Sequence, residues 1–546
     1  MEKKLLITGV FDFKPTNMVI VENILQKMDN ESSPGNSGIP IKVLKSSSIL
    51  TQQITNLFNH CILEKCIPNE WKSSVVTPLY KKKGNEDDLN NYRGISVISP
   101  LAKVFEKILA SQIIEYINEY NILTADQHGF RSNHSCETAL HELISDLNTA
   151  RDNTLASLLL FIDFRKAFDL IDSKLLIHKL SLMGFTKNAQ QLIENYFNER
   201  EQVVKYNNIY SDSASIKLGV PQGSVLGPLF FTLFINDLPL LIENLNKKLF
   251  ADDTTFYKSM PDVKDLIDYF VDNIQPLINW CKTNKLDLNW SKTFFFFIKN
   301  KRFNYPREIL INNNVIQVVD NFKLLGVTLD SKLSFDEFIT CTKKTINKKL
   351  NSIKKLFYLS HNVKIQFFKS FIIPHFDYCL TLCIYFPKAT LQRLCNLFYL
   401  CLFNLFNLKF FNNCNIIHNQ LETMSLFSFQ HHLLLKLSIF LYKIINNTDV
   451  INLNKFIEIQ KNTHYNLRSN LVNGKQLCTN NHYGKATCKY FFPKLKTIIG
   501  PEEFDLKFSF FKNRINNNII ILNDTFVKEF PKFDLYIKNF DYLKKK

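Results

Sequence analysis

The sequence contains no uninterrupted apolar run of the roughly 18–20 residues that a membrane-spanning helix requires. Its first residues, MEKKLLITGVFDF, hold only a short apolar stretch before Asp12, so we expect no secretory signal peptide. The 12 cysteines include no CxxC pair, which argues against a disulfide framework in a chain of 546 residues. These absences predict an intracellular protein with no part in the membrane.

The sequence also lacks a complete set of zinc ligands. Cys478, His482 and Cys488 have part of the spacing of a zinc knuckle, but no fourth ligand follows at a usual distance. Ordinary thiols and a surface histidine are therefore the favoured interpretation.

Acidic side chains are outnumbered by basic ones. The 67 Lys and Arg against 50 Asp and Glu give a net charge of +17. Such a surplus suits a polyanionic partner, either nucleic acid or an acidic membrane surface, although a merely basic protein is an alternative. The length and the 46% hydrophobic content allow roughly two to four domains.

Hydrophobic periodicity predicts mixed helices and strands up to residue 335 and mostly helices beyond it. We expect helices over 19–28, 41–66, 101–120 and 166–183, and strands over 74–80, 155–164, 248–257, 285–298 and 321–330. The run LASLLLFIDF (155–164) is almost entirely apolar and ends at an acid. It predicts a buried central strand whose end delivers the Asp163 carboxylate.

Three acids lie in or beside these apolar strands: Asp163, Asp252 and Asp253. A carboxylate in a buried sheet is costly unless it is paired or binds a metal. Adjacent acids would point to opposite faces of a regular strand, so a tight hairpin turn near Asp163 is the expected setting. Three convergent carboxylates would offer hard oxygen ligands to two Mg²⁺ ions for phosphoryl transfer. An acid pair alone, however, is more often a plain turn feature.

A glycine-rich segment stands out because glycine is scarce. Three of the 14 glycines, at 219, 223 and 227, fall within LGVPQGSVLGPLFF (218–231). Glycine permits close backbone approach to a ligand, and Gln222 can offer its amide to a base or sugar. The alternative is a plain loop before an apolar helix at Leu229–Ile235.

Five segments succeed one another in order: FIDFRKAFD (161–169), GVPQGSVLGP (219–228), FADD (250–253), LNWSKT (288–293) and LLGVTLD (324–330). This succession resembles the palm motifs of the reverse transcriptase family, particularly its non-LTR (LINE-like), jockey-like branch. SPGNSGIP, WKSSVVTPLYKKKG, NYRGISVISPLAKVFEKIL and QHGFRSNHSCETAL resemble the fingers motifs of that branch. The resemblance covers roughly residues 10–335 strongly and the rest loosely.

The resemblance implies an α+β right-hand polymerase with fingers, an antiparallel-sheet palm, a helical thumb and a mostly helical C-terminal extension. The expected divisions are a lead-in at 1–33, fingers and palm at 34–335, thumb and connection at 336–445, and an extension of unknown role at 446–546. We expect a lysine-rich helix at 343–356. Its lysines would suit contact with nucleic-acid phosphates or a solvated helix face equally well. Elements of this branch usually encode an endonuclease before the polymerase. We expect no endonuclease domain in this chain, so another protein would have to make the DNA nick.

The resemblance also implies roles for single residues. Asp163 and Asp252 match the two essential metal ligands and Asp253 the third acid, for two Mg²⁺ ions that Mn²⁺ can replace. Phe168 matches a bulky aromatic residue that excludes a ribose 2′-hydroxyl, which makes the product DNA. Lys292 matches a basic residue proposed to protonate the pyrophosphate leaving group.

Other matched residues would contact the nucleotide. Gln222 and Gly223 match the part that packs against the incoming nucleotide and the template. Arg93, and Lys81 less closely, match cations that hold the triphosphate. For Arg93 and Lys292 the alternative is a solvated surface cation. The usual proline after the Arg93 position is Gly94 here, which we expect to loosen a loop.

The implied activity is RNA-directed DNA polymerase: template-directed transfer of dNTPs to a primer 3′-OH on a retrotransposon RNA. Template RNA, primer DNA and dNTPs are the expected partners, in a cytoplasmic ribonucleoprotein and the nucleus. An RNA-dependent RNA polymerase is an alternative that Phe168 and the FADD box disfavour. The other alternative is an inactive or co-opted nucleic-acid-binding remnant. The joint retention of the three acids, Gln222 and Lys292 disfavours it.

Overall fold

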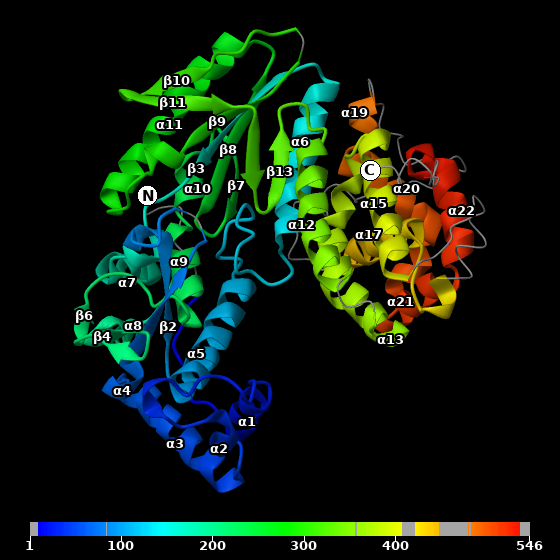
Figure 1. Cartoon of the computed structure of the whole chain (residues 1–546). Helices are drawn as coiled ribbons and strands as arrows, with labels where there is room; N and C mark the ends of the chain where they lie inside the picture. The colour runs from blue at the N-terminus through cyan, green and yellow to red at the C-terminus, as the bar shows by residue number, and fades with distance from the viewer. Residues whose placement is uncertain are drawn as a thin grey trace, which may run out of the picture. The chain divides into compact units, whose positions relative to one another are not determined.

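The structure, a computed structural model, describes residues 9–82, 84–300, 302–354, 358–406, 421–446, 479 and 482–535 (Figure 1). Cys478 of the incomplete zinc motif lies outside these residues. The chain forms two compact units that are each discontinuous in sequence. The first contains Met1–Phe130, Ile162–Thr254 and Val271–Thr293, and the second contains Arg131–Phe161, Thr255–Phe270 and Phe294–Lys546.

The first unit combines helices with a small mixed sheet. Its helices are α1 (Met18–Gln26), α2 (Ile41–Leu44), α3 (Ser48–Glu64), α4 (Asn69–Lys72), α5 (Pro100–Glu119), α7 (Ser173–Leu182), α8 (Lys187–Phe197), α9 (Leu226–Ile235) and α10 (Leu238–Leu241). Its strands are β1 (Ser73–Tyr80), β2 (Tyr92–Val97), β4 (Arg200–Tyr206), β5 (Ile209–Tyr210), β6 (Ala214–Ile216) and β7 (Asn246–Phe250). In the small sheet, β1 pairs antiparallel with β2 and parallel with β4.

The second unit carries most of the large sheet and most of the later helices. Its strands are β3 (Ala156–Ile162), β8 (Asp253–Met260), β9 (Phe294–Ile298), β10 (Glu308–Ile311), β11 (Asn314–Val319), β12 (Asn321–Leu324) and β13 (Val327–Asp330). Its helices are α6 (Cys136–Asp152), α12 (Asp336–Lys354), α13 (His361–Phe367), α14 (Ile373–Asp377), α15 (Lys388–Phe406), α17 (Phe429–Asn446), α19 (His482–Lys485), α20 (Cys488–Ile499), α21 (Phe508–Asn517) and α22 (Ile519–Glu529). Helix α11 (Val263–Thr283) begins in this unit and ends in the first.

The large sheet has the strand order β10-β11-β9-β3-β8-β7, so the buried strand β3 is central as predicted. The expectation of an antiparallel sheet is wrong in part. Strand β3 pairs antiparallel with β9, but β11 pairs parallel with β9. The second strand of the β10–β11 hairpin, rather than the first, lies beside β9, which breaks the alternation. The fold class is mixed α+β.

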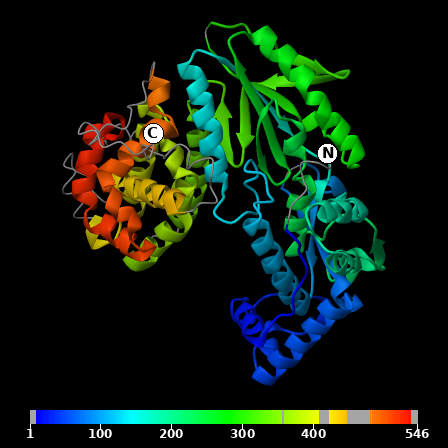
Figure 2. The same cartoon turned by 180° about the vertical axis from the view of Figure 1, so that it is seen from behind.

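Helices cover both faces of the large sheet, which explains why β9 has the sequence FFFFI (Phe294–Ile298). Phe295 contacts Phe270 of α11, with ring centroids 5.6 Å apart. Phe296, its neighbour in the strand, faces the other way and joins a core with Leu140 and Leu143 of α6. Alternate side chains of a strand point to opposite faces, so a strand buried on both faces is apolar throughout. Figure 2 shows α6 and α11 on different sides of the sheet.

Helix boundaries follow local capping rules. Helix α5 begins at Pro100 after Ser99, whose side chain accepts a hydrogen bond from the Ala102 amide. Helix α6 begins with a capping box between Ser135 and Thr138. In α12 the side chains Ile346, Leu350 and Ile353 form a buried apolar face.

The helix predicted over 166–183 is wrong at its start. Lys166 has a left-handed backbone, and only a short 3₁₀ turn, η4 (Ala167–Asp169), follows it. Helix α7 begins at Ser173, where Asp172 caps the Lys174 and Leu175 amides. A capping acid inside the apolar pattern therefore divides the segment, and the break positions Phe168 and Asp169.

No helix among the described residues is both long and apolar enough to cross a bilayer.

Candidate active site

The end of strand β3 positions Asp163 as the apolar run predicted. Its backbone carbonyl accepts a hydrogen bond from the Asn289 amide at 2.8 Å. Its carboxylate Oδ2 accepts from Asn289 Nδ2 at 3.0 Å and lies 3.3 Å from Lys292 Nζ. The 3₁₀ turn η5 (Trp290–Lys292) brings this ammonium to the acid. Asn289 belongs to the LNWSKT segment, but its contact with Asp163 was not predicted.

Asp252 and Asp253 lie at a hairpin, as their adjacency predicted. Strands β7 and β8 are neighbours in the sheet, and only Ala251 and Asp252 join them. Ala251 has a positive φ of 57°, which few residues other than glycine adopt readily. Asp253 is the first residue of β8. The tight turn places the two carboxylates beside one another.

The three acids act on one another electrostatically. Burial raises the pKa of Asp252, as does the charge of Asp163, whereas the positive charge of Arg93 acts in the opposite direction. Burial, Asp252 and Asp163 together raise the pKa of Asp253 to about 6. Like charges that approach one another favour protonation of one member. The structure therefore brings Asp163, Asp252 and Asp253 into one electrostatic group.

The buried side chain of Gln127 contacts the turn that carries Asp252. The Oε1 of Gln127 accepts hydrogen bonds from the Ala251 amide at 3.0 Å and the Gly129 amide at 2.8 Å. A Cβ on Gly129 would lie 2.3 Å from the Ala251 nitrogen, so only glycine fits there. Gln127 and Gly129 belong to the QHGFR segment, yet nothing in the sequence signals their contact with a turn more than 100 residues later.

Phe168 is fixed in place by other aromatic rings. It stacks on Phe231 of α9, with centroids 4.4 Å apart, and meets Phe130 edge-on at 6.3 Å. Its backbone carbonyl accepts from the Val220 amide at 2.9 Å. These contacts leave the ring half-buried at the edge of the glycine-rich segment.

The glycine-rich segment packs closely on two neighbours. A Cβ on Gly219 would meet the Asp169 backbone at 2.6 Å, and one on Gly223 would lie 2.5 Å from the Ser96 carbonyl. Gln222 donates from Nε2 to Asp169 Oδ1 at 3.0 Å, and its own carbonyl accepts from the Ser96 amide at 2.7 Å. Asp169 thus holds the Gln222 side chain in place.

Glu106 anchors the end of this segment and was missed by sequence reasoning. Its Oε2 accepts from the Val225 amide at 2.6 Å and the Leu226 amide at 3.3 Å, at the start of α9. Its Oε1 accepts from the Tyr196 hydroxyl at 3.2 Å. Burial raises the pKa of Glu106, although these bonds oppose the shift. Glu106 lies on the apolar face of α5, among Ala102, Leu109 and Ile113, and an acid on that face is the signal that could have revealed it.

The two cations predicted to bind the nucleotide differ in their surroundings. Arg93 is an exposed residue of β2 whose charge acts on Asp252. Lys81 follows β1, and its Nζ donates to the Asn90 carbonyl at 2.8 Å. Gly94 lies within β2, opposite Pro78, so the expectation of a loosened loop after Arg93 is wrong. The pairing of β2 with β1 fixes the backbone there.

The donors at this site suit a hard divalent cation. Carboxylate oxygens are preferred ligands of such ions. Burial and the charges of Asp252 and Asp163 raise the pKa of Asp253, and a bound cation would offset the repulsion among these acids. In the described part of the chain, no three His, Cys, Asp or Glu side chains lie close enough together to hold a metal ion. Asn289 and Lys292 also contact one Asp163 oxygen. Metal binding would therefore require the carboxylates to reorient.

Comparison with known proteins bears directly on these residues. The family model described as reverse transcriptase (RNA-dependent DNA polymerase) matches residues 80–329. Residues 80–329 form a reverse transcriptase domain. This confirms the family predicted from the ordered motifs. Members of the reverse transcriptase family depend in general on divalent metal ions. Every residue to which the sequence assigned a role lies within the reverse transcriptase domain.

Curated relatives of the chain come from mobile elements of Drosophila melanogaster. A "Probable RNA-directed DNA polymerase from transposon X-element" is 28% identical over 383 residues, which cover 66% of this chain and 40% of the relative. A "Probable RNA-directed DNA polymerase from transposon BS" is 27% identical, over 63% of this chain and 39% of the relative. The "RNA-directed DNA polymerase from mobile element jockey" is 25% identical, over 68% and 42%. The chain therefore spans about two fifths of the length of these relatives.

Proposed function

We propose that the chain is an RNA-directed DNA polymerase that copies a retrotransposon RNA into DNA by adding dNTPs to a primer 3′-OH. The observation that carries the proposal is the electrostatic group of Asp163, Asp252 and Asp253 inside the reverse transcriptase domain. The net charge of +17 suits the polyanionic template and primer. The names of the Drosophila relatives agree with this activity.

A right-hand polymerase architecture is part of the proposal. Fingers and palm comprise residues 34–335, thumb and connection 336–445, with a lead-in at 1–33 and an extension at 446–546. The sheet β2-β1-β4-β5 and the helices around it suit the fingers, and the six-stranded sheet suits the palm. The helices from α12 to α17 suit a thumb that contacts nucleic acid.

Each site residue has a proposed task. Asp163, Asp252 and Asp253 hold two Mg²⁺ ions, which when bound supply the charge that activates the 3′-hydroxyl and neutralises the pyrophosphate. Lys292, beside Asp163, gives a proton to that leaving group. Asn289 orients the Asp163 carboxylate. The Phe168 ring, braced by Phe231, excludes a ribose 2′-hydroxyl.

Other residues bind the nucleotide and the template. Arg93 and, more weakly, Lys81 hold the triphosphate, because guanidinium and ammonium groups bind phosphate oxygens. Gln222 and Gly223 form a surface beside the incoming nucleotide and the template. In its element the enzyme works in a cytoplasmic ribonucleoprotein and in the nucleus.

Primer extension tests the proposal. The purified chain is given oligo(dT)-primed poly(rA), dTTP and Mg²⁺, beside the variant Asp252→Asn. The matched control is Asp268→Asn, an exposed acid of α11 outside the site. Loss of a ligand to catalytic metals should lower the extension rate by several orders of magnitude, whereas the control should extend like the wild type. A wild-type chain that binds the duplex and extends nothing in Mg²⁺ or Mn²⁺ would refute the proposal.

A further inference from the structure

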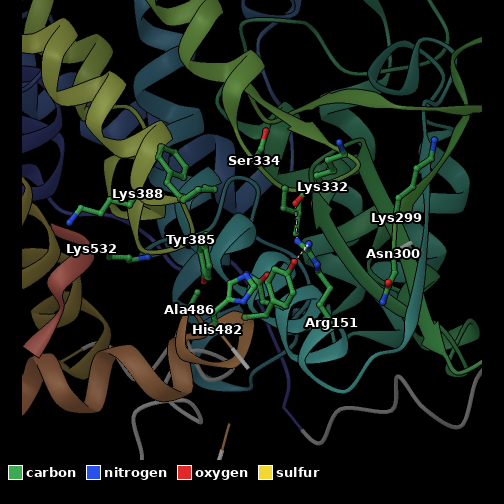
Figure 3. A pocket seen from close by; sticks show the side chains of 15 residues that line it. Arg151, Lys299, Asn300, Lys332, Ser334, Tyr385, Lys388, His482, Ala486 and Lys532 are labelled. Atoms are coloured by element: carbon green, nitrogen blue, oxygen red, sulfur yellow. Dashed lines mark hydrogen bonds between the residues drawn. The ribbon is translucent and has the colours of Figure 1, made fainter. Parts of the chain in front are cut away.

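The second unit contains a pocket of about 680 Å³. Six basic side chains line it: Arg151, Lys299, Lys332, Lys388, His482 and Lys532. They come from α6, the end of β9, the loop before α12, the start of α15, α19 and the 3₁₀ turn η9 (Pro531–Phe533). Among the described residues that line the pocket, none is acidic. In Figure 3, Arg151 and His482 lie between Lys388 and Lys532 on one side of the view and Lys299 on the other.

Most of these cations are not neutralised by a carboxylate within the described chain. Lys388 donates to the Pro531 carbonyl at 3.2 Å, and Lys532 donates to the Ile384 carbonyl. Arg151 donates to the Lys332 carbonyl at 2.8 Å and to the Tyr483 hydroxyl at 2.7 Å. All of these acceptors are neutral.

Two acids lie near the pocket without neutralising it. Lys299 pairs with Asp320, so its charge is already balanced. Asp330 acts on Arg151 from a distance, but its carboxylate accepts from the backbone amides of Lys332, Ser334 and Phe335. Burial lowers the pKa of Lys532 to about 8, as expected for an ammonium group without an anionic neighbour. The pocket therefore keeps a net positive charge.

Aromatic rings accompany the cations. The Arg151 guanidinium lies 3.8 Å from the Tyr483 ring centroid, and the His482 ring lies 3.9 Å from the same ring. Tyr385 and Phe386 also line the pocket. Cations on phosphates combined with rings beside bases are the usual means of binding single-stranded nucleic acid.

We propose that this pocket binds a segment of single-stranded RNA, with Arg151, Lys332, Lys388 and Lys532 on its phosphates and His482 and Tyr483 beside a base. The choice of RNA rests on the proposed function, in which RNA is the template. A volume near 680 Å³ exceeds what one phosphate ion needs and suits a splayed nucleotide rather than a duplex. The segment 482–535, which otherwise has no assigned role, contributes His482, Tyr483 and Lys532 to the pocket.

Fluorescence anisotropy with labelled oligouridylate tests the proposal on the full chain. Excess unlabelled primer–template duplex, of a sequence that cannot pair with oligouridylate, is present throughout to occupy the polymerase site. The test variant carries Lys332→Ala and Lys388→Ala, two exposed pocket residues. The matched control carries Lys512→Ala and Lys528→Ala, exposed lysines of α21 and α22 outside the pocket, so both variants lose the same charge.

The expected effect follows from counterion release. Each phosphate contact on a single strand contributes about 0.7 to the slope of log affinity against log salt. Loss of two contacts should therefore lower the slope by about 1.4 and the affinity roughly 25-fold at about 0.1 M salt. The control pair should bind nearly as the wild type does. Equal loss in both pairs, or none in the pocket pair, would overturn the proposal.

Two further measurements identify the ligand and its place. Oligouridylate containing 4-thiouridine should crosslink to a peptide containing His482 and Tyr483, and crosslinks confined to other segments would contradict the proposal. Inorganic phosphate or uridine monophosphate should compete only at far higher concentration than RNA. Competition at equal concentration would make the pocket a small-anion site instead, and complete displacement by the duplex would mean that no separate RNA site exists.

The outcome is independent of the polymerase proposal. Asp252→Asn should bind oligouridylate as the wild type does while losing primer extension. If the wild type extends no primer yet the pocket variant still loses RNA binding, the pocket proposal stands and the polymerase proposal fails.

Discussion

The contact between Asn289 and Asp163 gives a sharp test of how the site is organised. Asn289 holds Asp163 at two points, the backbone carbonyl at 2.8 Å and the carboxylate Oδ2 at 3.0 Å. Its own carbonyl accepts from the Lys292 amide at 2.9 Å. Asn289 thus links the acid at the end of β3 to the turn that carries the lysine, and its side chain makes the bond to the carboxylate. We predict that Asn289→Ala lowers the rate of nucleotide addition.

The size of the effect can be worked out from the hydrogen bond. A hydrogen bond to a charged group contributes about 1.5–3 kcal/mol, and a partly exposed one contributes less. The Asp163 side chain is 34% exposed, so about 1–2 kcal/mol is reasonable. If that orientation is needed in the transition state, kcat should fall about 5- to 30-fold. Asn289→Asp should fall further, because a second carboxylate would then face Asp163.

The assay is steady-state primer extension with dTTP varied, so that kcat and KM are separated. Because Asn289 positions an acid rather than the nucleotide, kcat should fall while KM for dTTP stays nearly constant. Asn279→Ala, an exposed asparagine of α11, is the matched control and should change neither value. Wild-type kcat in Asn289→Ala, with an unchanged unfolding midpoint, would show that this reasoning is wrong.

Two other predictions concern specificity and pH. Phe168→Val should let UTP compete with dTTP, raising the UTP to dTTP ratio of kcat/KM by about tenfold or more, since pocket contacts of this size are worth about 1–3 kcal/mol. Phe168→Tyr should keep the wild-type ratio, and an unchanged ratio in Phe168→Val would contradict the steric role. His141 is buried between Tyr385 and Thr381, and burial lowers its pKa to about 3 from 6.5. Below pH 6.5 the unfolded chain takes up a proton that the folded chain excludes, so stability is lost as the pH falls. From pH 7 to 5 the wild type should lose about 2 kcal/mol more of its free energy of unfolding than His141→Gln does, measured by urea unfolding. Equal losses in both proteins would refute this.

Short-range patterns in the sequence determined much of the fold and part of the site. The apolar run before Asp163 could only be a strand buried on both faces, and β3 is central in the sheet. Adjacent acids cannot share one face of a strand, and Asp252 and Asp253 indeed lie at a hairpin. The order of the motifs, with Gly219, Gly223 and Gln222 between the acids, was enough to predict the reverse transcriptase family.

The same patterns gave wrong predictions where a single residue interrupts an element that the hydrophobic periodicity predicts as continuous. The apolar spacing over 166–183 resembles a single helix, but Asp172 caps a helix that begins at Ser173. Strand spacing likewise cannot tell which strand of the β10–β11 hairpin lies beside β9, so the parallel pairing was missed. Periodicity reports which face of an element is apolar and not which element covers it.

Only the tertiary structure decided the contacts that hold the site together. Asn289 on Asp163, Gln127 on Ala251 and Glu106 on Val225 each join residues more than 100 positions apart. The cationic pocket likewise needs α6, α15 and α19 to meet. Composition and spacing determine which side chains are available and which element each belongs to. Which of them meet depends on the path of the whole chain, because hydrogen bonds and charge pairs act over a few ångströms in space.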